Sequence, residues 1–190
     1  MISQSYNNIV TPELSLYAIL NKEFHGFEQD YIVMHCLLKI HKPATFFEIG
    51  TNHGTGTQII KNVLGDNATV YTLDLPTEKI HESLLKTGGG DNVGINCKLP
   101  FIQLRGDSTT FNYKDYPCEG YFVDGEHDYD HVTAETLAIL RNQPQIVIYH
   151  DADIPGVYDA IVDAFKAAGS NYDLYRVIGT RIAYALKKSV

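Results

Sequence analysis

The sequence predicts one α/β domain built on a doubly wound, Rossmann-like sheet of seven mostly parallel strands, with an antiparallel C-terminal hairpin and an N-terminal helical cap. Three observations support this prediction. The chain has 190 residues, the size of a single domain. Hydrophobic residues make up 44% of it, which is enough for a core without disulfides. Short apolar runs alternate with helical patterns along most of the chain, as in parallel crossover units.

The first 43 residues differ from the rest and are expected to form a helical cap over the cleft or a dimerisation segment. Thr11 and Pro12 are typical of the cap and first residue of a helix, which we expect over residues 11–22. A second helix is expected over residues 27–40, and Pro43 ends it. The domain proper is predicted over residues 44–190.

From residue 44 onward, strands and helices alternate. Strand patterns occur seven times, at residues 45–49, 69–73, 101–105, 120–123, 146–149, 172–177 and 181–186. Helical patterns separate most of them, at residues 56–64, 77–86, 130–140 and 157–168.

Two connections depart from this alternation. Only a few residues around Gly179 join the last two strands, so these strands must pair as an antiparallel hairpin. Residues 87–100 follow neither period and are expected to form a loop, either a lid over a site or a plain surface excursion.

Composition excludes several classes of protein. The formal net charge is -8, with 15 Lys and Arg against 23 Asp and Glu, so a nucleic-acid partner is not expected. No stretch approaches the ~20 apolar residues of a membrane helix, and the first ten residues do not form an export signal. The three cysteines are scattered, which is typical of reduced thiols. We therefore expect a cytoplasmic protein that binds a small neutral or cationic ligand, or a metal.

The most informative segment runs from the first predicted strand into a glycine-rich turn and a helix. Its pattern is E-x-G-x-x-x-G-x-G, formed by Glu48, Gly50, Gly54 and Gly56. Glycines let the backbone turn sharply and approach a ligand beneath the positive end of a helix. The spacing is not the G-x-G-x-x-G of a dinucleotide site, and the acidic residue suits a ligand with a cationic amino-acid end. The alternative is a turn with a purely structural role.

This segment resembles the first motif of the class I S-adenosylmethionine-dependent methyltransferases. The resemblance implies that S-adenosylmethionine is the cofactor and that Asp74, beside Leu75, accepts the ribose hydroxyls from the end of the second strand. It also implies that Asp107 and Ser108, after the third strand, bind the adenine. A helix cap is the alternative role of Asp107, and the two roles are compatible. The residues implied in the turn itself are Glu48, Gly50, Thr51, Asn52, His53, Gly54 and Gly56. For His53, a solvent-facing position is the alternative.

Two predicted parallel strands each end in an aspartate, Asp124 and Asp151. Because carboxyl ends of neighbouring parallel strands open onto one crevice, these side chains should converge. Adjacent carboxylates repel unless a proton or cation lies between them, and oxygen ligands favour a hard divalent ion such as Mg²⁺. A zinc site is the weaker alternative; it would use His127 and His131, which are four residues apart.

The segment D-G-x-H-x-Y, together with the strand ending in His-Asp, resembles one branch of metal-dependent O-methyltransferases. This branch includes macrolide-sugar and rhamnosyl O-methyltransferases and their cephalosporin-hydroxylase-like relatives. The resemblance implies that Asp124 and Asp151 bind the metal, that Asp124 also lines the cofactor site, and that His127 is the general base. His150 or Asp153 would complete the ligand set. Ala152 departs from the Asp-Asn pair of the catechol-type enzymes, so the third ligand stays open.

The expected function is metal-assisted transfer of a methyl group from S-adenosylmethionine to a hydroxyl of a small molecule or sugar, in a protein that forms a homodimer if the N-terminal segment pairs. Two alternatives stay open. The same fold could serve a metal-dependent hydrolase or hydroxylase-like enzyme, or a non-catalytic cofactor-binding subunit.

Overall fold

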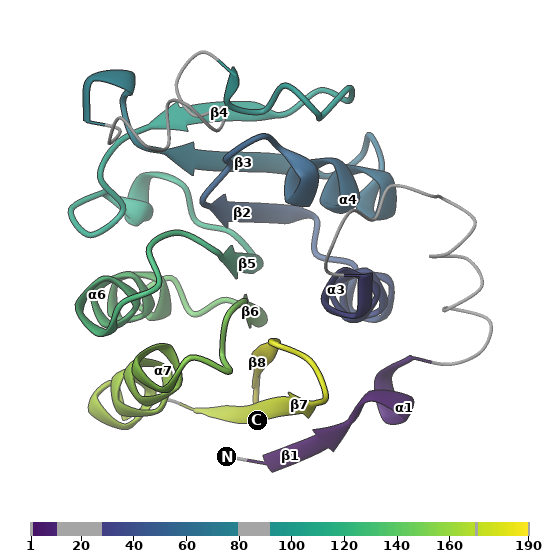
Figure 1. Ribbon diagram of the computed structural model, residues 1–190, viewed down its shortest axis with the longest axis vertical. Coiled ribbons are helices and arrows are strands. Elements are labelled where there is room, and N and C mark those ends of the chain that lie inside the picture. Colours follow the sequence, from purple (N-terminus) through teal and green to yellow (C-terminus); the bar gives the residue numbers. More distant parts are fainter. Residues whose placement is uncertain (1, 11–27, 80–91, 170, 190) are drawn as a thin grey trace.

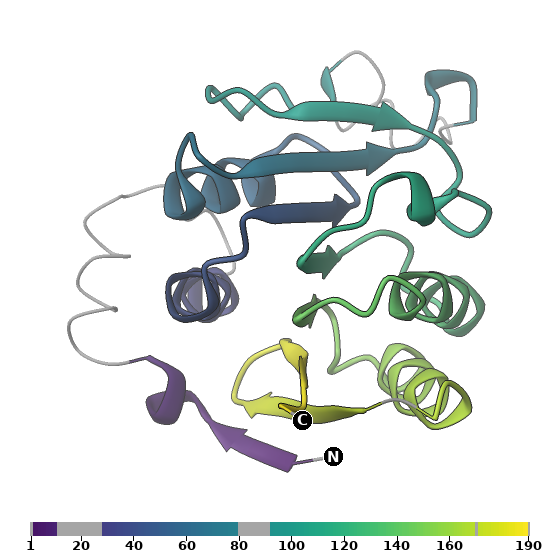
Figure 2. The ribbon, with the colours of Figure 1, turned by 180° about the vertical axis from the view of Figure 1, so that it is seen from behind.

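The computed structural model describes residues 2–10, 28–79, 92–169 and 171–189. In this part of the chain, one eight-stranded sheet is covered on both faces by helices (Figure 1). Helices α3 (Glu28–His41) and α4 (Thr55–Leu64) cover one face, and α6 (Tyr129–Leu140) and α7 (Pro155–Ala167) cover the other. The same layers are visible from behind (Figure 2). The predicted doubly wound α/β fold is confirmed.

Five parallel strands form the middle and one side of the sheet, in the order β6-β5-β2-β3-β4. Strand β8 continues the sheet antiparallel to β6, and β7 pairs antiparallel with β8, which confirms the predicted hairpin. The bounds are β2 Thr45–Ile49, β3 Thr69–Asp74, β4 Ile102–Arg105, β5 Gly120–Val123, β6 Ile146–Tyr149, β7 Tyr172–Ile178 and β8 Ala183–Lys187.

The eighth strand was not predicted. Strand β1 (Ile2–Ser5) lies at the edge of the sheet, parallel to β7, with Ile2 opposite Tyr175. Only one of its four residues is apolar. An edge strand can do without a buried apolar face, because backbone hydrogen bonds to its neighbour hold it. The short helix α1 (Tyr6–Ile9) follows it. The helix expected over residues 11–22 lies outside the described residues, whereas the one expected over 27–40 is observed as α3.

Two other predicted segments are only partly described. At the start of the helix expected over residues 77–86, the structure has a single 3₁₀ turn, η1 (Thr77–Lys79), and residues 80–86 lie outside the described part. In the predicted loop over residues 87–100, residue 92 is in 3₁₀ conformation, and residues 93–100 form turns without helix or strand, as expected. A second 3₁₀ turn, η3 (Tyr113–Asp115), precedes β5.

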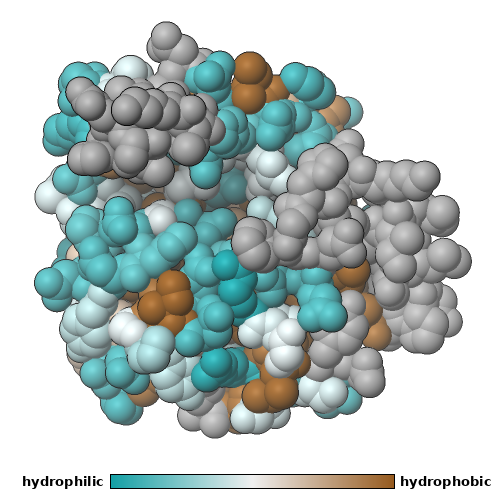
Figure 3. All heavy atoms as spheres, viewed as in Figure 1, coloured by the Kyte–Doolittle hydropathy of each residue, from teal (hydrophilic) through white to brown (hydrophobic). Residues whose placement is uncertain are grey.

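The core consists of two apolar layers, one on each face of the sheet. Neighbouring residues of a strand point to opposite faces, so Phe46 belongs to the layer under α3 and α4, whereas Phe47 belongs to the layer under α6 and α7. All residues of β5 and β6 are buried. On the face seen in Figure 3, the described surface is mostly hydrophilic, with small separate hydrophobic patches. The buried strands therefore fix the positions of the polar residues that follow them.

Candidate active site

The carboxyl ends of β2 and β5 lie side by side in the sheet, and the chain continues from them in opposite directions. Strands β3 and β4 extend the sheet on the β2 side, whereas β6 lies on the β5 side. Ligands of open α/β sheets bind at such a switch point. The predicted site residues lie in or directly after strands β2 to β6, so the fold brings both predicted half-sites to this edge.

The turn after β2 requires glycine at its first position. Gly50 has a φ of +92°, and a Cβ atom there would overlap the backbone carbonyl oxygen of Asp124. Gly54, at the start of α4, has a φ of +84°, and Asn52 between them is also left-handed, with a φ of 46°. Because backbone approaches backbone at Gly50, the predicted cofactor turn lies directly against the residue that begins the predicted metal site.

Glu48 and Gly56 have a packing relation that the sequence did not reveal. The Glu48 side chain is buried, and the Thr57 hydroxyl hydrogen-bonds to its carboxyl group. A Cβ atom at residue 56 would overlap this carboxyl, so glycine makes room for it. Burial raises the pKa of Glu48 well above its usual range, the Thr57 bond opposes this shift, and Asp124 and Asp74 add to it. The environment thus favours a neutral carboxyl beneath the turn.

Asp74 links the ends of β2 and β3. One of its carboxylate oxygens accepts a hydrogen bond of 2.7 Å from the Asn52 amide, and the other accepts one of 2.8 Å from the Leu75 amide. Each carboxylate oxygen has a further lone pair. The side chain is therefore oriented by the backbone and can still accept the hydroxyl hydrogens of a ribose.

Residues 92–96 pack on the glycine turn. The Gly94 amide donates to the Asn52 carbonyl, and the Asn96 amide donates to the His53 carbonyl, both at 2.8 Å. The Thr51 side chain is buried, and its hydroxyl accepts a hydrogen bond of 3.0 Å from a glutamine of β4. His53 is half-buried. The described part of the loop predicted over residues 87–100 is thus bonded to the turn.

Asp107 caps a turn. Its Oδ1 accepts hydrogen bonds from the Thr109 hydroxyl at 2.6 Å and from the Thr109 amide at 3.0 Å, and these bonds lower the pKa of Asp107. A turn over residues 108–110 follows Asp107, so this residue caps a turn and not the helix of the alternative prediction. The carbonyl of Ser108 accepts a bond of 2.9 Å from the Tyr113 hydroxyl. Backbone and side-chain bonds therefore hold the expected adenine-binding turn.

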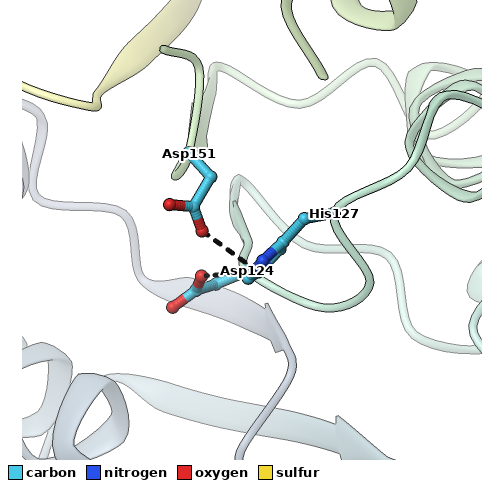
Figure 4. A group of neighbouring side chains, drawn as sticks. All are labelled: Asp124, His127 and Asp151. Carbon is cyan, nitrogen blue, oxygen red and sulfur yellow. Dashed lines mark ion pairs between the residues drawn. The ribbon is translucent and has the colours of Figure 1, made fainter. Parts of the chain in front are cut away.

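Asp124, His127 and Asp151 form a compact group beyond the ends of β5 and β6. One nitrogen or oxygen atom of each residue lies within 4.8 Å of the others. His127 Nε2 is 3.1 Å from Asp151 Oδ2 and 3.7 Å from Asp124 Oδ1. Both carboxylates point toward the imidazole (Figure 4). The Asp151 side chain is 6% exposed and that of His127 is 45% exposed, so the group opens to solvent at the histidine.

His150 lies against the same two carboxylates. Its Nδ1 is 3.2 Å from Asp124 Oδ1 and 3.0 Å from Asp151 Oδ2, and the residue is buried. Burial acts to lower the pKa of His150, but hydrogen bonds with Asp124, Asp151 and Asp30 outweigh it and raise the pKa to about 11. A metal bound through Nδ1 would have to displace this proton. Asp153, the other predicted third ligand, is exposed and lies outside the group of three.

Two carboxylates and one imidazole are a suitable donor set for a divalent cation. Carboxylate oxygens prefer hard ions such as Mg²⁺ or Mn²⁺, and three side chains leave coordination positions for water and a ligand. Within the described residues, Asp124, His127 and Asp151 are the one group of three or more acidic, histidine or cysteine side chains that lie close enough together to hold a metal. His131 of the zinc alternative hydrogen-bonds instead to Asp128, at 2.7 Å, at the start of α6.

Three residues that surround this group could not be predicted from sequence motifs. Asp30 and Tyr31 come from α3, and Arg181 comes from the turn before β8. Arg181 forms ion pairs with Asp30 and Asp151, and the Tyr31 ring stacks on His150 at a centroid distance of 6.4 Å. Burial raises the pKa of Tyr31 to about 12, and Asp124 and Glu48 add to this. Single acidic, aromatic or basic residues in such segments have no motif, so only the fold reveals them.

The glycine turn, Asp74, Asp107 and the acidic group all lie at the switch point of a Rossmann-like α/β sheet, which is where such folds bind ligands. A family model described as a methyltransferase domain matches residues 47–152, which is more than half of the chain. The chain belongs to this methyltransferase family. The match runs from β2 through Asp151 and so includes most of both half-sites.

Solved structures of other methyltransferases are similar in fold. SAH-bound PaMTH1 of Podospora anserina is 15% identical, with a TM-score of 0.60 and coverage of 93% of this chain and 87% of that one. An O-methyltransferase from Bacillus cereus in complex with SAH is 16% identical, with a TM-score of 0.59 and coverage of 95% and 94%.

MycE, a methyltransferase of mycinamycin biosynthesis in complex with Mg, SAH and mycinamycin VI, is 15% identical, with a TM-score of 0.62 and coverage of 92% of this chain and 53% of that one. This chain thus spans about half of MycE. At such identities, the likeness establishes the fold. A search of curated protein sequences finds no match. Among the described residues, no helix has the length and apolar character needed to cross a membrane.

Proposed function

We propose that this protein transfers the methyl group of S-adenosylmethionine to a hydroxyl of a small molecule or sugar, with the help of a divalent cation, Mg²⁺ in the first place. The observation that carries the proposal is the position of Asp124, His127 and Asp151 directly beside the glycine turn. A bound methyl donor and a metal-bound acceptor would then be neighbours, as in-line transfer requires.

In the cofactor half, the glycine turn would hold the amino-acid end of S-adenosylmethionine. Asp74 would accept the ribose hydroxyls, because both of its oxygens are oriented by backbone amides and keep lone pairs for a ligand. Asp107 and Ser108 would contact the adenine. The SAH-bound structures of similar fold support this assignment.

In the metal half, Asp124 and Asp151 would hold the cation, and His127 or His150 would supply a third ligand. A divalent cation, when bound, lowers the pKa of a coordinated hydroxyl. His127, if it is not a ligand, is the general base: its ring is the most exposed of the group and lies on the solvent side, where an acceptor would arrive. A positioned base of this kind contributes roughly 10² to 10⁴-fold to the rate.

The acceptor is proposed to be small and not a nucleic acid. The net charge of -8 disfavours a polyanion, and MycE, which has a similar fold, holds a macrolide together with Mg and SAH. Cys36, Cys97 and Cys118 form no disulfide in the described part of the chain, which is in keeping with a reducing, cytoplasmic setting. A homodimer is proposed as well, through the N-terminal segment.

The test is calorimetric titration of the purified protein with S-adenosylmethionine and with SAH, with and without Mg²⁺. Micromolar binding of both nucleosides is expected, and SAH release in the presence of a panel of hydroxyl compounds would then identify the acceptor. If neither nucleoside bound under either condition, the proposal would be wrong. Metal-dependent turnover without the cofactor would instead favour a hydrolase or hydroxylase-like enzyme. Cofactor binding without turnover of any acceptor would favour a non-catalytic subunit.

A further inference from the structure

We propose that Asp30 and Arg181 form a clamp that positions Asp151 for metal binding, so that helix α3 and the β7–β8 turn are working parts of the active site. The inference rests on the metal-assisted function proposed above. It concerns two residues outside the strand ends from which such sites are usually built, and both act through Asp151 as positioning residues.

Arg181 is held between two buried carboxylates. Its Nη1 donates to Asp151 Oδ1 at 2.7 Å, and its Nε donates to Asp30 Oδ2 at 2.9 Å. The backbone amide of Arg181 donates to Asp30 Oδ1, also at 2.9 Å. Both aspartate side chains are 6% exposed. Asp30 thus fixes the guanidinium and the main chain of Arg181 together, and the rigid planar fork carries that fixation to Asp151.

The clamp divides the two oxygens of Asp151 between separate tasks. Oδ1 is occupied by Arg181, whereas Oδ2 is directed at His127, 3.1 Å away, and at His150, 3.0 Å away. The backbone is tied to the same residue, because the Ala152 amide donates to the Arg181 carbonyl at 2.8 Å. Asp151 itself has a left-handed φ of 51°, which a non-glycine residue keeps only when its surroundings impose it. One residue therefore restrains both the side chain and the main chain.

A structural role alone explains this arrangement poorly. A buried ion pair is seldom more stabilising than apolar residues of similar volume, because both charges must leave water. Most other buried residues of α3 are apolar, and Val33, Cys36 and Leu37 among them belong to the core. The charged network lies at the end of α3 that reaches Asp151, a candidate metal ligand. Such a network is expected where the orientation of a metal ligand must be controlled.

Charge and geometry make opposite predictions for metal affinity. If Arg181 acted by its charge alone, its removal would make the net charge around Asp151 more negative, and Mg²⁺ would bind more tightly. If Arg181 acts as a clamp, its removal frees the carboxylate to rotate, and Mg²⁺ binds more weakly. Lysine separates the two further, because it keeps the charge but cannot make the forked contacts to Asp30 and Asp151 at once.

The experiment is calorimetric titration of Mg²⁺ into the full chain with SAH present, for the wild type and for Arg181→Gln, Arg181→Lys and Asp30→Asn. Each variant is expected to weaken Mg²⁺ binding roughly 10- to 100-fold, the usual effect of losing a residue that orients a metal ligand. SAH affinity, measured in the same samples, should change less than about twofold. The double variant Asp30→Asn/Arg181→Lys should be no weaker than the worse single one, because the two residues act as a unit.

The matched control is Arg176→Lys on β7. The Arg176 guanidinium lies 5.0 Å from the centre of the Tyr158 ring, whereas Arg181 is the arginine paired with Asp30 and Asp151, so replacing Arg176 should leave Mg²⁺ affinity unchanged. Unchanged or tighter Mg²⁺ binding by Arg181→Gln, with SAH still bound, would overturn the clamp and leave the proposed function intact. If Arg181→Gln did not fold, Arg181→Lys would decide, because charge alone predicts unchanged Mg²⁺ affinity for this variant and the clamp predicts weaker binding. A wild type that bound SAH but no divalent cation would refute the clamp and the metal-assisted part of the function together.

Discussion

The two halves of the candidate site are held in different ways. At the ends of β2, β3 and β4, the acidic side chains are held mainly by backbone amides and by residues close in sequence: Asp107 bonds to Thr109, and Asp74 bonds to the Leu75 and Asn52 amides. At the ends of β5 and β6, the carboxylates meet histidine and arginine side chains. The Asp30 to Arg181 contact there spans 151 positions of the chain.

This difference indicates what each half can tolerate. Where main-chain amides hold a carboxylate, the orientation depends on a short turn and on its glycines. Where side chains hold it, the orientation depends on the packing of distant elements. We therefore expect substitutions in one half to change the affinity for the cofactor and substitutions in the other half to change the affinity for the metal. Gly50 is the exception, because the two halves touch there.

The largest expected effect comes from Asp124→Asn. Losing one carboxylate of the group should abolish Mg²⁺ binding and reduce methyl transfer at least about 1,000-fold, since a metal supplies several kcal/mol of stabilisation in such reactions. SAH affinity, followed by calorimetry, should stay within about threefold. The matched control is Asp153→Asn, two residues after Asp151 and exposed, which should leave Mg²⁺ binding as it is. Mg²⁺ binding lost in the control and kept in Asp124→Asn would move the metal site to Asp153.

Next in size is Gly50→Ala, which attacks the contact between the halves. The new methyl group would meet the Asp124 carbonyl in a left-handed backbone, so we expect unfolding free energy to fall by about 3 kcal/mol and both Mg²⁺ and SAH binding to weaken. Gly169→Ala is the comparison: its φ is +55°, but nothing lies within 4 Å of the added Cβ, so only about 1 kcal/mol should be lost. Urea denaturation measures both, and equal losses would show that the close approach of the two turns is unimportant.

The smallest expected effect is that of Asp74→Ala. It removes the carboxylate that is proposed to accept the ribose hydroxyls, and the loss of such charged hydrogen bonds to a ligand costs about 2 kcal/mol, or roughly 30-fold in SAH affinity. Mg²⁺ binding should hardly change. Asp66→Ala, in an exposed turn before β3, serves as control. Calorimetry that found Mg²⁺ affinity reduced as much as SAH affinity would contradict the separation of the halves.

Sequence reasoning succeeded where local patterns decide the structure. Strands β2, β5 and β6 have the bounds that their apolar runs predicted, because a buried strand needs apolar residues at nearly every position. The positions of Asp124 and Asp151 follow from those bounds and from the strand order. The glycine turn could also be predicted from the sequence, since few residues other than glycine tolerate its backbone angles.

Reasoning from the sequence failed where distant contacts decide. Strand β1 has too few apolar residues to stand out, and its partner β7 lies at the other end of the chain. Glu48, which was expected to bind the cofactor, is buried and hydrogen-bonded by Thr57, a packing contact that the glycine pattern did not indicate. Asp30 and Arg181 are ordinary charged residues in their own segments, and only the complete fold brings them to Asp151.

The 151-residue separation between Asp30 and Arg181 also bears on the order of folding. Closing so long a loop carries a large entropic cost, which is recovered only when the contacts around it form. During synthesis the chain emerges from its N-terminal end, so β2 to β4 can pair before the β7–β8 turn exists. The cofactor half is then expected to mature early, and a metal-competent site only after nearly the whole chain has been made. Nascent or truncated chains would accordingly be kept from premature chemistry by topology alone.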